Sequence, residues 1–506
     1  MRGGELGNST GEPDYLRSSW PKLKAMNLNT VVAPIYWELM EPEEGKFDFA
    51  QLDGLLKDAR EQHMHLVLLW FGVWKNSMST YVPGWVKRDS ARFVHSQDSA
   101  GNALEILSPF SGKVLTADVK AFRALMSHLR TVDQKENTVV LVQVENEIGM
   151  IPEARDHSPE AEQKFREAVP AELTSYLSKN TDTLAVELRD GWVAHGKKIT
   201  GTWTDLFGEG TATDEIFMAW HFSRFVEKLT AEGKAEYPLP MYVNAALIRP
   251  GHKPGQYPSA GPLPHLFDVW RAGAPSLDLL APDIYFTNFG EWSRKYAGHG
   301  NAFFIPEAMR SVEASVNGLY AIAGYDAMGF SPFGIESVGE PAARYLTDSF
   351  GLIAQLTPLI LEHQGRGTMV GLLPEGPEQR QPQQVLLGGY TMHVTFDKPM
   401  GPDVADGVPP GGSGAAAQAV PPTGGLMIAT APDEFIIAGT GITTTFQIRN
   451  RGSPQVGLLS VEEGRFVEGK WTHIRWLNGD QTHQGRHVKL DSGRFSLQKV
   501  KLYQYR

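Results

Sequence analysis

Residues 137–150, NTVVLVQVENEIGM, carry the clearest structural signal in the chain. They begin with the apolar run 139–142, which is too short for a helix and typical of a strand buried on both faces. Two carboxylates and two amides follow at once, within residues 143–147. Because an unpaired buried carboxylate costs much free energy, this cluster predicts either a solvated acidic loop or a functional site. In an α/β barrel, the carboxyl ends of the strands face the active site.

Composition narrows the classes of protein that the chain can be. Its 506 residues are enough for two or three domains, and 42% hydrophobic with 21% charged residues is ordinary for a globular protein. The formal net charge of -11 argues against a nucleic-acid or anionic-membrane partner. Cysteine is absent, which excludes disulfides, thiolate metal sites and cysteine nucleophiles. The longest apolar run, 66–74, is too short to span a bilayer.

Other apolar runs resemble residues 139–142 and alternate with segments of helical periodicity. We expect strands at residues 3–6, 30–35, 65–70, 139–142, 240–245, 277–285, 302–307 and 327–333. We expect helices at 13–27, 51–62, 118–131, 170–193, 214–233 and 342–363, and a loop at 201–208. Eight buried strands alternating with helices predict an α/β fold, a (β/α)8 TIM barrel over residues 1–363 with its chemistry on one rim.

A different pattern begins after residue 363. Short alternating runs and hairpin signals predict a C-terminal β-rich, sandwich-like domain over residues 364–506. The expected strands are 384–387, 435–438, 443–449, 455–461, 471–477 and 495–503. Residues 399–425 are rich in Gly, Pro and Ala, which predicts a flexible loop within this domain.

Two glutamates, Glu147 and Glu307, end two of the expected barrel strands. If these strands are the fourth and the seventh, both side chains face one central pocket. Paired carboxylates about 5 Å apart suit retaining glycoside hydrolysis, in which one attacks the anomeric carbon and the other protonates the leaving oxygen. The acid needs a raised pKa, which a second carboxylate nearby helps to produce. Asn146 could hydrogen-bond a sugar hydroxyl beside the reacting centre.

The run QVENEIG, residues 143–149, resembles the acid/base motif of family 35 β-galactosidases, in the clan of (β/α)8 retaining glycosidases. Residues 30–49 resemble the second-strand signature that families 35 and 42 share, and the C-terminal domain is similar to that of a bacterial branch of family 35. The resemblance covers nearly the whole chain. It implies that Glu147 is the acid/base and that Glu307, in Phe-Ile-Pro-Glu, is the nucleophile.

The chain departs from this family at several positions. Members have a complete first strand and a His at the position of Gly7, whereas Met1 lies inside the strand here, so we expect a truncated start and a disturbed barrel seam. Many members carry a Glu where Lys75 and Asn76 stand. No signal peptide is visible, so the compartment stays open, although the resemblance would allow a periplasmic or secreted protein.

Several other residues lie at expected strand ends or in loops on the rim. Each is either part of the core or a wall of the pocket, where it would bind substrate: Tyr36, Trp37, Trp74, Trp203, Tyr285, Glu5 and Asn76. Tyr36 and Trp37 replace a tyrosine arrangement of the animal enzymes. Glu145 is expected to be structural or a hydrogen-bond partner.

These observations predict a glycoside hydrolase, a retaining exo-β-galactosidase that removes terminal β-D-galactosyl residues. Another retaining β-glycosidase of the same clan and a non-catalytic sugar-binding barrel are the alternatives. We expect no cofactor and no metal, because the sequence has no P-loop, no His-Glu-x-x-His helix and no Gly-x-Gly-x-x-Gly after a strand. The expected partner is a carbohydrate substrate, with no nucleic acid and no membrane. The oligomeric state stays open, a homo-oligomer included.

Overall fold

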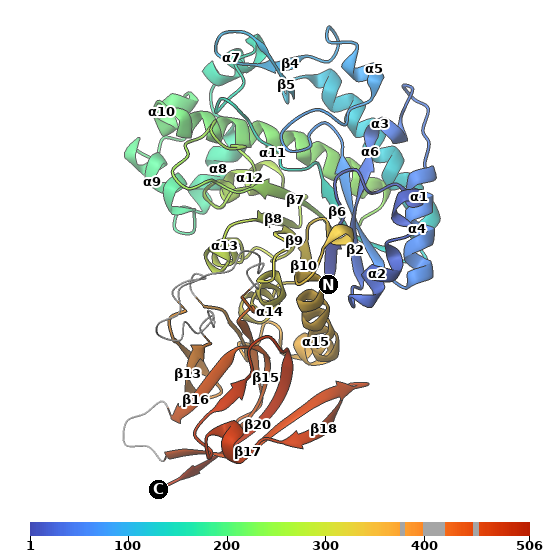
Figure 1. Ribbon diagram of the computed structural model, residues 1–506. Helices are drawn as coiled ribbons and strands as arrows, with labels where there is room; N and C mark the ends of the chain where they lie inside the picture. The colour runs from blue at the N-terminus through green and yellow to red at the C-terminus, as the bar shows by residue number, and fades with distance from the viewer. Residues whose placement is uncertain (375–379, 398–419, 449–454) are drawn as a thin grey trace, which may run out of the picture.

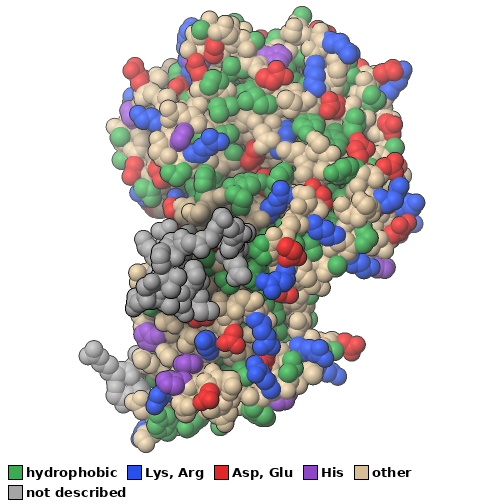
Figure 2. Space-filling model, viewed as in Figure 1, with side chains coloured by type: hydrophobic (Ala, Val, Ile, Leu, Met, Phe, Trp, Pro, Cys, Tyr) green, Lys and Arg blue, Asp and Glu red, His purple; other side chains and the backbone are tan. Residues whose placement is uncertain are grey.

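A computed structural model describes residues 1–374, 380–397, 420–448 and 455–506. Figure 1 shows a barrel surrounded by helices and, beside it, a C-terminal domain made of strands. On the face seen in Figure 2, acidic and basic side chains are interspersed, without a surface of one sign. Among the helices of the described residues, none combines the length and the apolar character that a membrane span needs.

The predicted (β/α)8 barrel is confirmed. Its eight strands pair in parallel in the order β1 Gly3–Glu5, β2 Thr30–Tyr36, β3 His65–Phe71, β6 Val139–Val144, β7 Met241–Ala246, β8 Leu279–Ile284, β9 Ile305–Ala308 and β10 Phe330–Pro332. β2 and β8 are buried along their whole length, as are all residues of β3 except the first. A strand that is buried on both faces consists mostly of apolar residues. These strands could therefore be recognised in the sequence as continuous apolar runs.

The barrel closes at its seam despite the short first strand. Bridges join Arg2 to Phe330 and Glu5 to Phe333 in parallel. A Cβ atom on Gly3 would lie 2.1 Å from Oγ of Ser331, so only glycine permits this approach of the two strands. The expected disturbance of the seam is therefore absent from the described residues.

Helices cover the outside of the barrel, and three expectations about them are wrong. The helices are α1 Pro13–Leu16, α2 Trp20–Ala25, α3 Trp37–Met40, α4 Ala50–Gln62, α5 Gly84–Lys87, α6 Gly112–Asp133, α7 Pro159–Arg166, α8 Ala171–Lys179, α9 Val186–Ala194, α10 Trp203–Phe207, α11 Thr211–Glu236, α12 Phe267–Gly273, α13 Phe289–Tyr296, α14 Ala314–Tyr325 and α15 Ala342–His363. The helix expected at 13–27 is split into α1 and α2, and the helix expected at 170–193 is split into α8 and α9. The loop expected at 201–208 contains α10, which begins with a capping box of Thr202 and Asp205.

The C-terminal domain consists of two antiparallel sheets around one core. The six-stranded sheet runs β11 Met369–Leu372, β14 Gly424–Ala431, β15 Glu434–Thr440, β20 Ser496–Tyr505, β17 Gln455–Val467 and β18 Lys470–Trp476. The four-stranded sheet runs β12 Gln383–Leu387, β13 Tyr390–Phe396, β16 Ile442–Ile448 and β19 Val488–Leu490. The loop expected at 399–425 lies outside the described residues up to 419, and its last two residues begin β14. A small hairpin in the barrel, β4 His95–Gln97 and β5 Ala103–Leu107, completes the strands.

The six-stranded sheet contributes to two cores because its side chains alternate. Leu426 and Ile428 of β14 belong to the core that they share with the barrel helices. Met427 and Ala429, between and after them, belong to the core of the C-terminal domain. Successive side chains of a strand point to opposite faces, so one sheet both closes the sandwich and covers the barrel.

Candidate active site

A left-handed turn follows β6 and sets the direction of Glu147. Glu145 and Glu147 have φ of 63° and 44°, which is uncommon for residues other than glycine. Two hydrogen bonds hold this turn: the amide of Asn146 donates to the carbonyl of Trp74 at 3.1 Å, and the amide of Glu147 donates to Oδ1 of Asn244 at 3.0 Å. The surrounding strands therefore hold an unfavourable backbone in place, which is common at functional sites.

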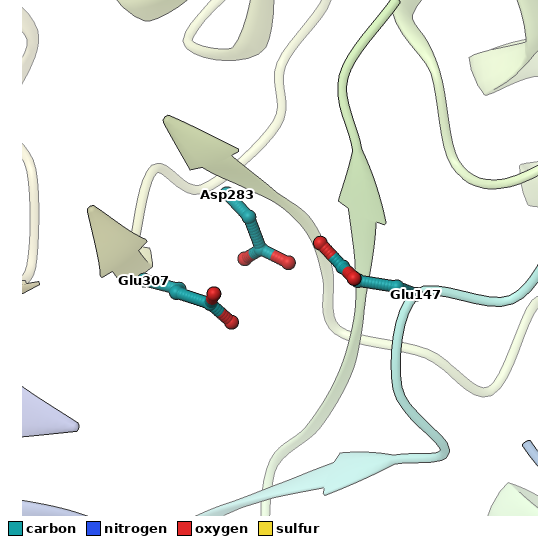
Figure 3. A group of neighbouring side chains, drawn as sticks. All are labelled: Glu147, Asp283 and Glu307. Atoms are coloured by element: carbon teal, nitrogen blue, oxygen red, sulfur yellow. The ribbon is translucent and has the colours of Figure 1, made fainter. Parts of the chain in front are cut away.

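Three carboxyl groups meet at the carboxyl ends of the barrel strands. One oxygen each of Glu147, Asp283 and Glu307 lies within 4.8 Å of the others. Figure 3 shows these side chains turned toward a common space, Asp283 from β8, Glu307 from β9 and Glu147 from the turn after β6. Glu147 and Glu307 are 8% and 6% exposed, so both can be reached only from the pocket. The sequence predicted that these two glutamates meet, and the structure brings them together.

Glu307 receives two hydrogen bonds from neighbouring acids and alcohols. The hydroxyl of Tyr285 donates to Oε1, and the carboxyl of Glu5 shares a hydrogen bond with the same side chain. Burial raises the pKa of Glu307 to about 7, and the nearby charge of Glu147 adds to the rise. Burial also raises the pKa of Glu5 well above its usual range, so Glu5 is neutral and donates.

Glu147 is held by the segment after β3. Nδ2 of Asn76 donates to its Oε2, and Oγ of Ser77 donates to its carbonyl at 2.8 Å. Nζ of Lys75 donates to Oδ1 of Asn146 at 3.0 Å and to Oδ1 of Asn76 at 2.5 Å. Asn76 therefore lies at the site, as predicted, although it contacts the presumed acid/base directly.

Two residues of the site, Asn244 and Asp283, were missed from the sequence. Nδ2 of Asn244 donates to Oδ2 of Asp283 at 2.6 Å, while Oδ1 of Asn244 accepts from the amide of Glu147. The signal was present, because each is a polar residue near the end of a buried strand. Lys75 was noted only as a departure from the family, and it too lies here.

Asn146 has an unused donor in the site. Its Oδ1 accepts from Lys75, but among the described residues no group accepts from its buried Nδ2. An unpaired buried donor costs free energy, so the amide is suited to bind a hydroxyl of a ligand. The substrate-binding role expected for Asn146 stays a prediction.

Glu145 lies behind the site and pairs with Asp118 of α6. Both residues are fully buried, and a hydrogen bond joins the two carboxyl groups. The amide of Trp74 donates to Oε2 of Glu145 at 2.6 Å, and Nε1 of Trp70 donates to Oδ1 of Asp118 at 2.9 Å. Burial raises both pKa values, that of Asp118 to about 6. Two buried carboxyls in contact are most stable when they share one proton.

Three tryptophans expected at the pocket wall are core residues instead. Trp37 packs against Trp70 and Trp85, and Trp74 packs against two phenylalanines of α11. Trp203 packs against Phe207 and Phe217, far from the strand ends. All three are at most 1% exposed, so they cannot stack on a sugar. These rings pack against other aromatic side chains of the core, so they do not line the site.

Tyr36 lies inside the upper end of the barrel. It belongs to a separate apolar cluster with Phe71 and Phe304, and its ring stacks on Tyr81 with centroids 5.5 Å apart. Its hydroxyl accepts from the amide of Gly11 at 3.1 Å. The ring is 4% exposed, so it supports the floor near the site, and contact with substrate stays a prediction.

The three carboxyl groups of the cluster lie close enough to one another that their oxygens could hold a metal ion. Each member already accepts a hydrogen bond from a protein donor: Asn76 for Glu147, Asn244 for Asp283 and Tyr285 for Glu307. Carboxyls that also share hydrogen bonds with one another are suited to hold protons. The absence of a metal, expected from the sequence, therefore stays a prediction.

Two parts of the chain match family models. Residues 11–192 match the model of glycoside hydrolase family 42, described as "Beta-galactosidase". Residues 346–489 match a domain of unknown function, DUF5597. The first match supports the expected likeness to β-galactosidases with a TIM barrel, but it indicates family 42, and family 35 is not supported. The second match begins within α15, so the boundary expected after residue 363 stays a prediction.

Curated relatives resemble only part of the chain. A β-galactosidase of Xanthomonas manihotis is 28% identical over 151 residues, which is 28% of this chain and 22% of that protein. Beta-galactosidase-1-like protein 2 of Homo sapiens is 26% identical over 186 residues, which is 36% of this chain and 27% of that protein. The matched segments thus span about a quarter of the length of these relatives.

Solved structures show the same fold. The β-galactosidase of the psychrophilic Marinomonas ef1 is similar with a TM-score of 0.50 and 12% identity, over 74% of this chain and 62% of that one. The β-galactosidase of Bacillus circulans sp. alkalophilus is similar with a TM-score of 0.50 and 15% identity, over 72% and 57%. At these identities the likeness concerns the fold alone.

Proposed function

We propose that the chain is a glycoside hydrolase, a retaining β-galactosidase that removes terminal, non-reducing β-D-galactosyl residues. The observation that carries the proposal is the approach of Glu147 and Glu307 to within 4.8 Å at the carboxyl ends of two barrel strands. Carboxyl groups about 5 Å apart leave no room for a water molecule behind the sugar, which favours double displacement over inversion. The match to the family 42 model supports the substrate class.

Glu307 is the nucleophile in this proposal. The donors Tyr285 and Glu5 stabilise its ionised form, which is the form that attacks the anomeric carbon. The attack forms a glycosyl ester with Glu307 and expels the leaving alcohol. Burial keeps water away until the second step, and the donors then stabilise the carboxylate that leaves again.

Glu147 is the acid/base. It gives a proton to the glycosidic oxygen in the first step and takes one from the attacking water in the second. The bond from Asn76 and the turn after β6 fix its direction. Nδ2 of Asn146 would donate to the hydroxyl next to the reacting carbon, an interaction that can strengthen in the transition state. Tyr36 and Glu5 would form the inner wall.

All residues of this mechanism come from residues 1–363, which we propose as the catalytic domain. Residues 364–506 would then form a second domain that covers α14 and α15 through the six-stranded sheet. This assignment makes the C-terminal domain a support of the barrel on the side of β9 and β10.

A panel of p-nitrophenyl glycosides tests the proposal directly. The purified chain is incubated with the β-galactoside, β-glucoside, β-mannoside, α-arabinoside and β-fucoside, and release of the phenol is followed. A dominant rate on the β-galactoside supports the proposal. A dominant rate on another sugar keeps the mechanism and overturns the substrate. If protein shown to be folded by circular dichroism releases no phenol from any of these substrates, the proposed enzymatic activity is overturned. A sugar-binding barrel is then favoured.

The stereochemical course is tested separately. Proton NMR of the first product formed from an aryl β-galactoside distinguishes the two anomers before they interconvert. We expect the β-anomer, since two inversions restore the starting configuration. The α-anomer as first product would contradict double displacement, even if the sugar were correct.

A further inference from the structure

Asp283 is a buried carboxyl that the proposed mechanism has not used. It is 2% exposed, and it lies at the end of β8, between the two glutamates of the site. Its Oδ2 accepts from Asn244, whereas no N–H or hydroxyl group among the described residues donates to its buried Oδ1. One donor does not compensate the burial of a full negative charge. Asp283 must therefore hold a proton or share one with a neighbour.

Glu147 is the neighbour with which Asp283 can share that proton. A hydrogen bond joins the two side chains. Asn244 links the same two residues a second time, because its amide group donates to Asp283 and its oxygen accepts from the backbone of Glu147. The relative position of the two carboxyls is thus fixed by a residue that contacts both.

The groups around Asp283 also disfavour its ionised form. Burial is the largest cause that raises its pKa well above the usual range, and the negative charges of Glu307 and Glu147 add to this rise. The titratable and charged groups that face this cluster come from β1, β7 and β9, from the segments after β3, β6 and β8, and from α13: Glu5, Tyr242, Glu307, Lys75, Glu147, Tyr285 and Tyr296. Lys75 donates to Asn76 and Asn146, so it partly offsets the negative charge without contacting Asp283.

We propose that Asp283 is a positioning residue that shares one proton with Glu147 and so keeps the acid/base supplied with the proton that it transfers. This inference rests on the proposed function, since it assigns the acid/base to Glu147. It goes beyond that function because a paired-carboxylate mechanism needs no third carboxyl at the reacting centre.

The charges of the cluster balance through the reaction. Before the first step, Glu307 carries one negative charge and the Asp283–Glu147 pair carries one. When Glu307 forms the ester it loses its charge, and the pair gives its proton to the leaving alcohol and becomes doubly negative. In the second step, the water gives one proton back to the pair while its oxygen displaces Glu307, which leaves as a carboxylate. The net charge of the cluster stays at minus two throughout, because the charge that the pair gains in the first step equals the charge that Glu307 loses in forming the ester.

Asp283→Asn tests the proposal through its pH profile. Asparagine can still accept from Asn244, but its amide donates permanently toward Glu147 and favours the ionised form of that residue. We expect the alkaline limb of kcat/KM to move to lower pH. We also expect a loss of about 10²-fold at pH 8 on phenyl β-galactoside, whose leaving group needs the proton, and little loss on the dinitrophenyl analogue.

A matched control removes a buried carboxylate outside the site. Asp268 is 4% exposed and accepts from the amide of Ala185 at 2.8 Å. Asp268→Asn is expected to change stability while leaving the alkaline limb where it is. If Asp283→Asn loses activity equally on both substrates with the limb unmoved, Asp283 merely contacts the sugar or supports the fold, and the proposal is overturned.

Infrared spectroscopy gives a second test that needs neither turnover nor that variant. The stretching band of protonated carboxyls is followed as the pH of the wild-type protein is raised. We expect one carboxyl to lose its proton over the range where kcat/KM falls, and we expect Glu147→Gln to abolish this change. A wild-type protein with no such transition contradicts the proton-sharing pair. A protein that shows it but is silent on all glycosides contradicts the proposed function instead.

Discussion

The hydroxyl of Tyr285 donates to Oε1 of Glu307, so the presumed nucleophile carries its own hydrogen-bond donor. The two residues come from consecutive strand ends of the barrel, after β8 and in β9. This contact lowers the pKa of Glu307 and opposes the effect of burial, which raises it. The hydroxyl of Tyr285, together with the carboxyl of Glu5, therefore helps to set the position of the acidic limb of activity.

Tyr285→Phe is expected to move that limb. Without the donor, the pKa of Glu307 rises further above its value of about 7, so the attacking carboxylate forms only at higher pH. The ratio of kcat/KM at pH 8 to that at pH 6 should increase relative to the wild type. Tyr257→Phe is the control, because that hydroxyl donates to Glu215 at 2.7 Å, away from the carboxyl cluster. An unchanged ratio in Tyr285→Phe would falsify the link.

Glu307→Gln is expected to lose turnover of every aryl β-galactoside. An amide cannot form the glycosyl ester, so a better leaving group does not help, and we expect a loss of about 10³-fold or more. Initial rates on nitrophenyl and dinitrophenyl substrates measure it. Recovery of activity on the better leaving group would show that Glu307 is not the nucleophile.

Glu147→Gln is expected to be selective for the leaving group. A poor leaving group needs the proton and should lose about 10²- to 10⁴-fold in kcat/KM, whereas a dinitrophenolate departs without it. Azide should restore turnover of the good substrate by attacking the ester that accumulates. Equal losses on all substrates, with no rescue, would contradict the acid/base assignment.

Asp118→Asn is expected to flatten the dependence of stability on pH. The carboxyl of Asp118 has a pKa of about 6 in the fold, against about 4 in an unfolded chain, so the folded form binds the extra proton. The stabilisation of the fold by this bound proton is fully present below the pKa of the unfolded chain. It is lost as the pH rises through about 6. The difference in Tm between pH 5 and pH 8 should shrink in the variant. A difference as large as that of the wild type would refute the shared proton with Glu145.

Gly72→Ala is expected to destabilise the protein. A Cβ atom there would lie 2.3 Å from Nε1 of Trp70 and 2.6 Å from Oε1 of Glu145, and both are buried. Overpacking of this kind costs about 1–3 kcal/mol of unfolding free energy. Gly191→Ala in α9 is the control, because its Cβ meets nothing within 4 Å and alanine favours a helix by roughly 0.5–1 kcal/mol. Urea unfolding of both variants measures the difference.

The barrel could be predicted because its strands are apolar throughout. Runs such as residues 65–70 have no solvated face, so they stand out against the amphipathic helices between them. Strands β11, β13, β14 and β19 of the C-terminal domain were not predicted, because their sequences are short or mix apolar residues with small and polar ones. Alternation at that length is also shown by loops.

The two glutamates could be predicted, whereas most of their surroundings could not. Glu147 and Glu307 end apolar runs, so their charge marks them. Asn244 lies within its strand and Asp283 follows a proline, and a single polar residue in a strand shows no direction until the register is known. The same uncertainty made Trp74 seem a wall of the pocket. An aromatic ring at a strand end can point either into the barrel or toward the surrounding helices. The ring of Trp74 packs against Phe222 and Phe225 of α11.

The close fit between the sheet and α14 makes the two halves of the molecule depend on each other. A Cβ atom on Gly371 would lie 2.4 Å from the carbonyl of Tyr320, so β11 approaches the backbone of the helix itself. That helix follows β9, the strand that carries Glu307. Without the C-terminal strands, the face of α14 that packs on β11 and β14 would be exposed to water. The barrel and the C-terminal domain should therefore unfold in a single calorimetric transition, as one cooperative unit. A variant that ends after α15 should fold in low yield.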